Sequence, residues 1–401
     1  MTGQDREYEK THPWLTFDVA RQLDRAPAQM WQLLGKVVAL AEHLAETPML
    51  PSYAERMHFV YLVKGAVATT AIEGNTLSEE DVKQLISKEL RLPPSKEYLG
   101  IEVQNMIEAF NAIMRAVTRG ETIQVTPGSI KDHNRQVLKN LQLELGVVPG
   151  EVSEHGVVVG PYRGAPRRDC DYLLGRLCEW LLNGVPDPAD KTPMATAVLR
   201  ALLSHVYLAW IHAFGDGNGR TARLVEFQIL ACGGVPGPAA HLLSNHFNDT
   251  RTEYYRQLNH ASRSGGDVVP FLVYALQGFY DGLQAQLAEL REQTEELMWR
   301  ELVDQAIAGH RPPDGRQRQL ALAMFARRRS APVRRADMPT MTVELARAHL
   351  DKTGKTLSRD LRVLLDLGLL RQEGKGAYRA AGEKILGLMP MRALRRDDLS
   401  R

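Results

Sequence analysis

A short segment near the middle of the chain, Ile211 to Arg223, holds a histidine, an aspartate, three glycines and two arginines. The apolar run before His212 predicts a helix that ends there, and a new helix is expected to begin near Arg220. Glycines let backbone N–H groups point towards one place, and the start of a helix adds partial positive charge there. Such a turn is suited to binding phosphate oxygens.

The charged residues of this segment add chemistry to the turn. Arg220 and Arg223 are three residues apart, near one face of the new helix, and each can pair with a phosphate through two N–H groups. Asp216 offers a hard oxygen ligand that suits Mg²⁺ bound together with a nucleotide. His212 can act as a general base because imidazole titrates near neutral pH. A Gly-rich turn with solvated charges is the alternative, but the combination favours a catalytic nucleotide site.

The segment resembles the signature motif of the Fic family, which runs His-Pro-Phe-x-(Asp/Glu)-Gly-Asn-Gly-Arg-x-x-Arg. His212 to Arg223 match it at every defined position except the second, where Ala213 replaces the usual proline. Because proline stiffens a turn, we expect Ala213 to reduce rigidity and to leave the mechanism intact. The chain is therefore expected to be mainly α: the resemblance implies a Fic/Fido helical core with a short β-hairpin flap, and a C-terminal winged helix-turn-helix is expected on separate grounds given below.

The resemblance also implies an enzyme that transfers AMP from ATP to a Tyr, Ser or Thr hydroxyl of a target protein, which could be the chain itself. His212 would deprotonate that hydroxyl, and Asp216 would hold Mg²⁺ between the α- and β-phosphates. The other matched positions would serve the nucleotide: Phe214 would anchor the loop, the backbone of Gly217, Asn218 and Gly219 would cradle phosphate with help from the Asn218 side chain, and Arg220 and Arg223 would take the β- and γ-phosphates.

A second informative stretch runs from Thr69 to Asn75. By itself it is typical of a helix end, with Gly74 stopping the helix and Glu73 in solvent. It also resembles the inhibitory motif of the family, (Ser/Thr)-x-x-x-Glu-(Gly/Asn), through Thr69, Glu73 and Gly74. The resemblance implies that Glu73 pairs with Arg223, excludes the γ-phosphate and keeps the enzyme autoinhibited.

Two further segments would complete the site. A strand signal predicts a short hairpin at the place of the family's flap, where main-chain hydrogen bonds would dock an extended target segment, although an ordinary surface hairpin is the alternative. Its residues are Val157, Val158 and Val159. The stretch from Ser244 to Tyr255 resembles the adenine side, with Thr250 where the family often has Asn. Tyr254 and Tyr255 are further candidates, although adjacent tyrosines often serve in packing.

The charges of the chain are unevenly placed. Its net charge is +2, but residues 311–401 hold 21 Lys and Arg against 10 Asp and Glu, whereas residues 1–310 hold 29 against 38. The pattern of helices and loops, taken together with the resemblance, divides the chain into four parts. They are an N-terminal helical region with the inhibitory motif (1–95), a Fic core (96–282), a helical connector (283–310) and a basic domain (311–401), with a linker at 311–315.

The basic domain resembles a winged helix-turn-helix. Helices are expected at 317–328, 342–350 and 355–367, followed by two short runs joined by a Gly-Lys-Gly turn. The third helix would face DNA, and phosphate contacts would make binding depend on salt. The candidate contacts are Lys355, Thr356, Ser358, Arg359, Arg362 and, at the tip of the wing, Lys375. Protein binding or dimerisation is the alternative use of this domain.

The composition narrows the class of protein and leaves some questions open. The 44% hydrophobic and 24% charged residues are ordinary for a globular protein, and Arg200 and His205 interrupt the most apolar stretch, so no membrane association is expected. Three cysteines without metal-type spacing favour a cytoplasmic location. Two alternative functions stay open: removal of AMP from a modified protein, with Glu73 orienting water, and DNA-binding regulation by a nucleotide-sensing core. A homodimer is also open.

Overall fold

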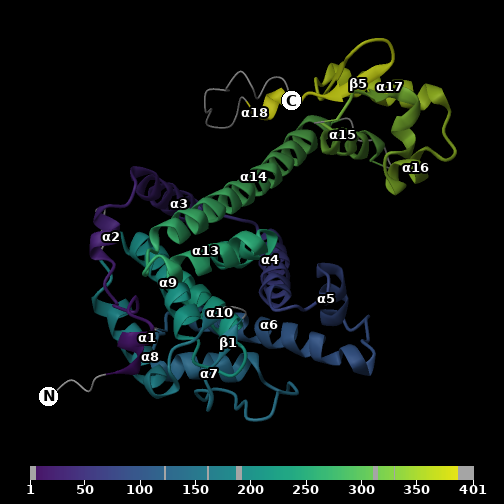
Figure 1. Ribbon diagram of the computed structural model, residues 1–401. Helices are drawn as coiled ribbons and strands as arrows, with labels where there is room; N and C mark the ends of the chain where they lie inside the picture. The colour runs from purple at the N-terminus through teal and green to yellow at the C-terminus, as the bar shows by residue number, and fades with distance from the viewer. Residues whose placement is uncertain are drawn as a thin grey trace. The chain divides into compact units, whose positions relative to one another are not determined.

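A computed structural model describes residues 6–121, 123–159, 162–186, 192–309, 315–328 and 330–386 (Figure 1). The chain divides into two compact units, Met1–Leu287 and Ala288–Arg401. Residues 311–314 of the predicted linker lie outside the described residues.

The first unit is built mainly from helices. In chain order they are α1 (Glu7–Thr11), α2 (Ala20–Asp24), α3 (Ala28–Glu46), α4 (Pro51–Ile72), α5 (Glu79–Ile86), the short 3₁₀ helix η1 (Pro94–Lys96), α6 (Glu97–Thr118), α7 (Pro127–Val137), α8 (Arg167–Asn183), α9 (Pro193–Ile211), α10 (Asn218–Cys232), α11 (Gly237–Ala240), α12 (Leu242–Asp249), α13 (Arg251–Arg263) and the first part of α14 (Val269–Ile307). A two-stranded hairpin, β1 (Val158–Val159) and β2 (Tyr162–Arg163), lies between α7 and α8.

The centre of this unit is α9, which packs along α10. Thr192 caps the start of α9 by accepting a hydrogen bond from the Ala195 N–H, and Pro193 occupies the first turn, where its missing N–H costs nothing. By length and composition α9 could cross a membrane, but 89% of its apolar window is buried inside the structure. It therefore has the environment of a core helix.

Two helix boundaries follow from the structure. Helix α7 ends at Val137, and Asn140 then takes a left-handed conformation with φ of 59°. The Asn105 amide holds this end by donating to the carbonyls of Val137 and Lys139. The connector predicted at 283–310 is not a separate helix, because α14 continues without a break from Val269 to Ile307.

The second unit combines the end of α14 with four helices and a small sheet. Its elements are α15 (Arg316–Ala326), β3 (Val333–Arg334), the 3₁₀ helix η2 (Arg335–Thr340), α16 (Val343–His349), α17 (Gly354–Asp366), β4 (Leu370–Gln372), β5 (Ala377–Ala380) and α18 (Glu383–Leu386). The sheet is antiparallel in the order β3-β5-β4, with Leu370 opposite Ala380. Trp299 stacks on Phe325 at 4.7 Å within a core that also buries Leu361 and Leu364.

Candidate active site

His212 stands at the exact point where α9 ends and the glycine-rich loop begins. It adopts a left-handed conformation, with φ of 48° and ψ of 52°, which is uncommon for a residue with a side chain. The ring Nδ1 donates to the Ala209 carbonyl at 3.3 Å, which leaves Nε2 as the proton acceptor. Burial lowers the pKa of His212, against the raising effects of the Ala209 carbonyl and of Glu73. The imidazole is thus suited to act as a neutral base.

The side chain of Asn218 holds the loop in shape. Its Oδ1 accepts from the Phe214 N–H at 2.9 Å, and its Nδ2 donates to the Phe214 carbonyl at 2.6 Å. Phe214 is buried, as expected for the residue that anchors the loop. The Asn218 side chain thus binds the backbone of Phe214 while Asn218 also lines the cavity, and its role in cradling phosphate stays a prediction.

Asn134, in the middle of α7, is a loop contact that the sequence reasoning missed. Its side chain donates to the Asp216 carbonyl at 2.9 Å and to the Thr221 hydroxyl at 3.2 Å, and it accepts from the Gly150 N–H at 2.9 Å. Asn134 is completely buried. The signal was present, because Asn134 lies four residues after Ile130 on the buried face of an amphipathic helix, where an amide needs polar partners.

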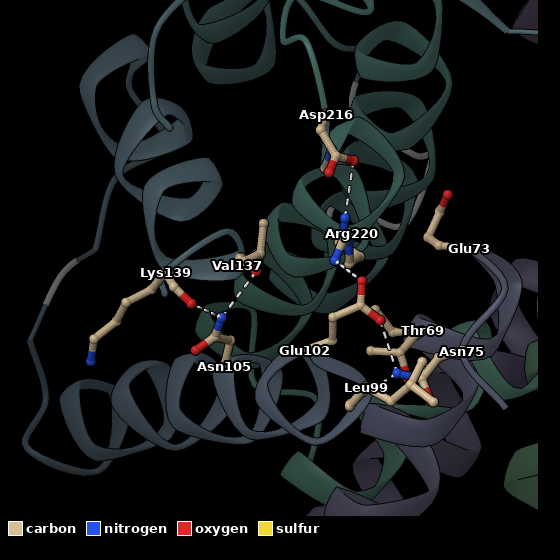
Figure 2. A network of polar contacts seen from close by, with 12 residues as sticks. Thr69, Glu73, Asn75, Leu99, Glu102, Asn105, Val137, Lys139, Asp216 and Arg220 are labelled. Carbon is tan, nitrogen blue, oxygen red and sulfur yellow. Dashed lines mark hydrogen bonds and ion pairs between the residues drawn. The ribbon is translucent and has the colours of Figure 1, made fainter. Parts of the chain in front are cut away.

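Asp216 and Arg220 face each other across the first turn of α10 (Figure 2). Asp216 Oδ1 accepts from Arg220 Nη2 at 3.0 Å and from the Gly217 N–H at 2.5 Å. The other terminal nitrogen of Arg220 donates to Glu102 of α6 at 2.8 Å, a partner that the sequence reasoning also missed. Within the described ranges, no donor contacts Asp216 Oδ2, and no three His, Cys, Asp or Glu side chains gather as a metal cage.

Glu73 follows the last residue of α4 and lies against the start of α10, beside Arg223. Arg223 Nη2 donates to Glu73 Oε1 at 2.5 Å and to the Thr69 carbonyl at 3.0 Å, so Thr69 contributes its backbone to this contact. Burial disfavours the charged carboxylate, but the Arg223 charge and hydrogen bond outweigh it, so the pKa of Glu73 lies below its ordinary value. A Cβ added at Gly219 would collide with the Glu73 carboxylate, which shows how closely Glu73 approaches the backbone of α10.

The guanidinium of Arg223 is buried but only partly satisfied. Its Nε and Nη1 have no hydrogen-bond partner among the residues that the structure describes. Unpaired donors of a buried cation are costly, so an anion that reached these two nitrogens would be stabilised. The carboxylate of Glu73 thus pairs with Nη2 of Arg223, whereas Nε and Nη1 face no acceptor among the described residues.

A cavity of about 630 Å³ brings most of the predicted site together. Its lining combines the loop, Glu73, the hairpin and α13: Glu73, Val157, Val158, Tyr162, Ala209, Trp210, His212, Gly215, Asp216, Gly217, Asn218, Gly219, Ala222, Thr252, Tyr254, Tyr255, Arg256, Leu258 and Asn259. Tyr162 and Asn259 were missed by the sequence reasoning. The cavity therefore presents the base, the turn at the start of α10 and aromatic side chains to one volume.

Thr250 does not line this cavity, and the prediction that it lies on the nucleotide side is wrong. Its hydroxyl donates to the His246 carbonyl at 2.7 Å and contacts the Tyr274 hydroxyl at 2.6 Å. Thr250 therefore forms the junction between α12 and α13 and faces α14. The neighbouring Tyr254 and Tyr255 do line the cavity.

Both tyrosines are positioned by hydrogen bonds to the elements around them. The Tyr254 hydroxyl lies 2.8 Å from Nε2 of His205, a buried residue of α9. The Tyr255 hydroxyl donates to the Ile72 carbonyl at 3.2 Å, directly before Glu73. The tyrosines thus connect α13 to the core helix and to the end of α4.

The predicted hairpin forms, with Val158 opposite Arg163 and Val159 opposite Tyr162. Val157 and Val158 line the cavity, and Val158 is 57% exposed, whereas the side chain of Val159 lies outside the described residues. The Tyr162 hydroxyl donates to the Trp210 carbonyl at 2.6 Å, which ties the hairpin to the end of α9. The hairpin therefore stands beside His212 at the edge of the cavity.

Comparison with known sequences places a family domain over this site. Residues 124–230 match the model of the Fic/DOC family. Protein adenylyltransferase fic-1 of Caenorhabditis briggsae is 27% identical over 62% of this chain and 45% of its own length. Protein adenylyltransferase fic-1 of Caenorhabditis elegans is 25% identical over 64% of this chain and 46% of its own length. Protein adenylyltransferase Fic of Nematostella vectensis is 27% identical over 55% of this chain and 47% of its own length. The chain thus spans less than half the length of these curated relatives.

Solved structures support the same fold. A Fic family protein from Desulfovibrio desulfuricans aligns with a TM-score of 0.53 and 19% identity over 89% of this chain and 97% of its own. A fragment of Fic-1 from C. elegans aligns with a TM-score of 0.51 and 24% identity over 66% of this chain and 74% of its own. These likenesses confirm the predicted mainly α Fic core.

Proposed function

Because this chain carries a Fic/DOC domain at residues 124–230, we propose that it transfers AMP from ATP to a hydroxyl side chain of a target protein. The observation that carries the proposal is the shared cavity, in which His212 and the start of α10 face one volume. Its curated relatives are named protein adenylyltransferases, which agrees with this chemistry. The target could be another protein or a second site on the same chain.

The residues of the cavity divide the work of the reaction. The triphosphate would lie at the N-terminal end of α10, where backbone N–H groups and the helix dipole favour anions, with Arg220 and Arg223 as cationic partners. His212 would take the proton of the attacking hydroxyl, and the hairpin at the exposed residue Val158 would align the target segment. Positioning and electrostatic stabilisation would supply most of the catalysis.

Asp216 fits a nucleotide-bound Mg²⁺. This ion is usually held by one or two carboxylates together with substrate phosphates and water, and Asp216 offers an oxygen with no donor against it in the described part of the chain. When bound, Mg²⁺ would neutralise charge on the phosphates. A single protein carboxylate is therefore consistent with a metal that arrives with ATP.

Glu73 provides the proposed autoinhibition. Its carboxylate takes the Arg223 donor that would otherwise serve the γ-phosphate, and it lies against Gly219 at the helix start. Two negative groups cannot share this place, so ATP would bind poorly or in an unproductive position while Glu73 stays. Removing Glu73 should release the site.

The test is transfer of labelled AMP to proteins of a cell lysate, with Mg²⁺ present and the labelled bands identified by mass spectrometry. Glu73→Gly should raise the transfer above wild type, and His212→Ala in the same background should abolish it. Glu55→Gln, an exposed carboxylate on the same helix α4, is the matched control and should change nothing. The proposal fails if Glu73→Gly and wild type are equally inactive. Release of AMP from a modified target by wild type, but not by Glu73→Gly, would instead favour the alternative function, in which Glu73 orients water to remove AMP from a modified protein.

A second function is favoured by the architecture of the second unit. We propose that this unit is a winged helix-turn-helix that binds DNA, because α16 and α17 are followed by the antiparallel strands β4 and β5. Lys355, Arg359 and Arg362 are exposed on α17, and Lys375 lies between two glycines with positive φ at the turn of the wing. Ser358 is different, because its hydroxyl contacts Arg335 and Gly354.

Fluorescence anisotropy with a labelled DNA duplex tests this second function. The double substitution Lys355→Glu and Arg359→Glu should weaken binding and flatten its salt dependence, since phosphate contacts release counterions. Arg300→Glu, an exposed cation on α14, is the control and should leave binding unchanged. Equal affinity of the double variant and wild type would exclude this use of α17.

A further inference from the structure

Glu102 of α6 is a carboxylate that joins the catalytic loop to the segment that carries Glu73 (Figure 2). Its Oε1 accepts from Arg220 Nη1 at 2.8 Å, and its Oε2 accepts from Asn75 Nδ2 at 2.8 Å. The side chain of Glu102 is 16% exposed and that of Arg220 is 4% exposed. Two charges with so little access to water need each other, because an unpaired buried charge is strongly unfavourable.

Asn75 holds the second oxygen of Glu102 in a fixed position. Its backbone N–H donates to the Thr70 carbonyl at 3.1 Å, and its Oδ1 accepts from the Leu77 N–H at 3.0 Å. Its Nδ2 donates to the Leu99 carbonyl at 2.9 Å as well as to Glu102. Asn75 is therefore an anchor between the end of α4 and α6, and the carboxylate of Glu102 has little freedom to turn.

The guanidinium of Arg220 is divided between two carboxylates. Nη1 contacts Glu102 and Nη2 contacts Asp216 Oδ1, so Asp216 receives only one arginine nitrogen. Without Glu102, both terminal nitrogens would be free to form a two-pronged pair with Asp216, which is the favoured geometry of arginine and carboxylate. Such a pair would occupy both oxygens of Asp216. It would thereby take Oδ2, the oxygen that a cation would use.

We propose that Glu102 is a positioning residue that keeps Arg220 from closing on Asp216 and thereby preserves the oxygen for nucleotide-bound Mg²⁺. The inference deepens the proposed function and rests on it. Glu102 acts through Arg220 and touches neither nucleotide nor acceptor. Its charge also offsets that of Arg220, so the loop is held in the geometry that ATP would meet.

The test measures how much Mg²⁺ strengthens ATP binding, by calorimetry in the presence of Mg²⁺ and in the presence of EDTA. All variants carry Glu73→Gly, so that the inhibitory carboxylate does not interfere. In this parent protein Mg²⁺ should strengthen ATP binding, and Glu102→Gln should reduce that gain at least about fivefold, in keeping with the loss of one charged hydrogen bond. Affinity without Mg²⁺ should change far less.

The matched control is Glu108→Gln, a carboxylate on the same helix that contacts Lys139 at the surface and should leave the gain unchanged. If Glu102→Gln does not fold, Asn75→Ala removes the partner of the other Glu102 oxygen and should reduce the gain in the same direction. An unchanged gain in a folded variant would overturn the role of Glu102. Absence of any AMP transfer or ATP binding by the Glu73→Gly parent would instead overturn the proposed function.

Discussion

The carboxylate of Glu73 and the guanidinium of Arg223 lie 2.5 Å apart, although 150 positions separate them in the chain. The contact places a carboxylate of the protein at the start of α10, the place that the proposed function gives to a nucleotide phosphate. Arg223 also keeps two buried nitrogens without an acceptor in the described part of the structure. This arrangement leads to expectations for stability as well as for activity.

Glu73→Gly should lower thermal stability in the absence of nucleotide and should make the protein more responsive to ATP. Removal of one partner of a buried ion pair costs about 3–5 kcal/mol, and the one-third exposure of the Glu73 side chain reduces this to about 1–3 kcal/mol. A ligand at a hundred times its Kd returns about 2.7 kcal/mol. Thermal shift assays with Mg-ATP should therefore show a larger rise in Tm for Glu73→Gly than for wild type. Equal rises would contradict the proposed inhibition of ATP binding by Glu73.

The pH dependence of AMP transfer should report the titration of His212. Burial lowers its pKa, and the base works only when deprotonated, so activity should persist as the pH falls and decline only below pH 6.5. Glu73 raises this pKa, and its removal should move the acidic limb further down. The kcat/KM profile of Glu73→Gly checks the expectation, and an acidic limb above pH 6.5 would show that another group is the base.

Asn134→Ala should disorder the catalytic loop without touching any catalytic group. The substitution leaves the Gly150 N–H and the Asp216 carbonyl without their buried partner, which should cost about 2–4 kcal/mol of unfolding free energy. Urea denaturation measures that loss, and ATP calorimetry in the Glu73→Gly background should show weaker binding. Asp132→Ala, which breaks an exposed ion pair on the same helix, should have little effect on either quantity. Full ATP affinity of Asn134→Ala would contradict the positioning role.

Thr250→Val tests whether the residue at the start of α13 serves packing or nucleotide binding. The hydroxyl contacts Tyr274 and His246 outside the cavity, so its loss should reduce stability by about 0.5–1.5 kcal/mol and leave ATP affinity unchanged. Asn259→Ala, at a residue that lines the cavity, should weaken ATP binding. Calorimetry in the Glu73→Gly background compares the two variants, and the opposite order would restore the original assignment of Thr250.

The sequence by itself identified the loop from His212 to Arg223, because the base, the glycine turn and the two arginines are contiguous and their geometry is local. Helix ends are also local, and so the C-terminal end of α9 and the start of α10 lie close to their predicted places. The resemblance of Thr69 to Gly74 to an inhibitory motif implied that Glu73 contacts Arg223, and the structure contains this contact.

Tertiary structure decided everything that depends on which face of a helix meets the loop. Glu102 and Asn134 come from α6 and α7, 118 and 82 positions away from the loop residues that they bind, and no local pattern specifies such a meeting. Thr250 was assigned to the wrong side for the same reason, since its hydroxyl direction is set by contacts with His246 of α12 and Tyr274 of α14. Side-chain contacts between distant helices are fixed by the packing of the whole core, which a single segment does not contain.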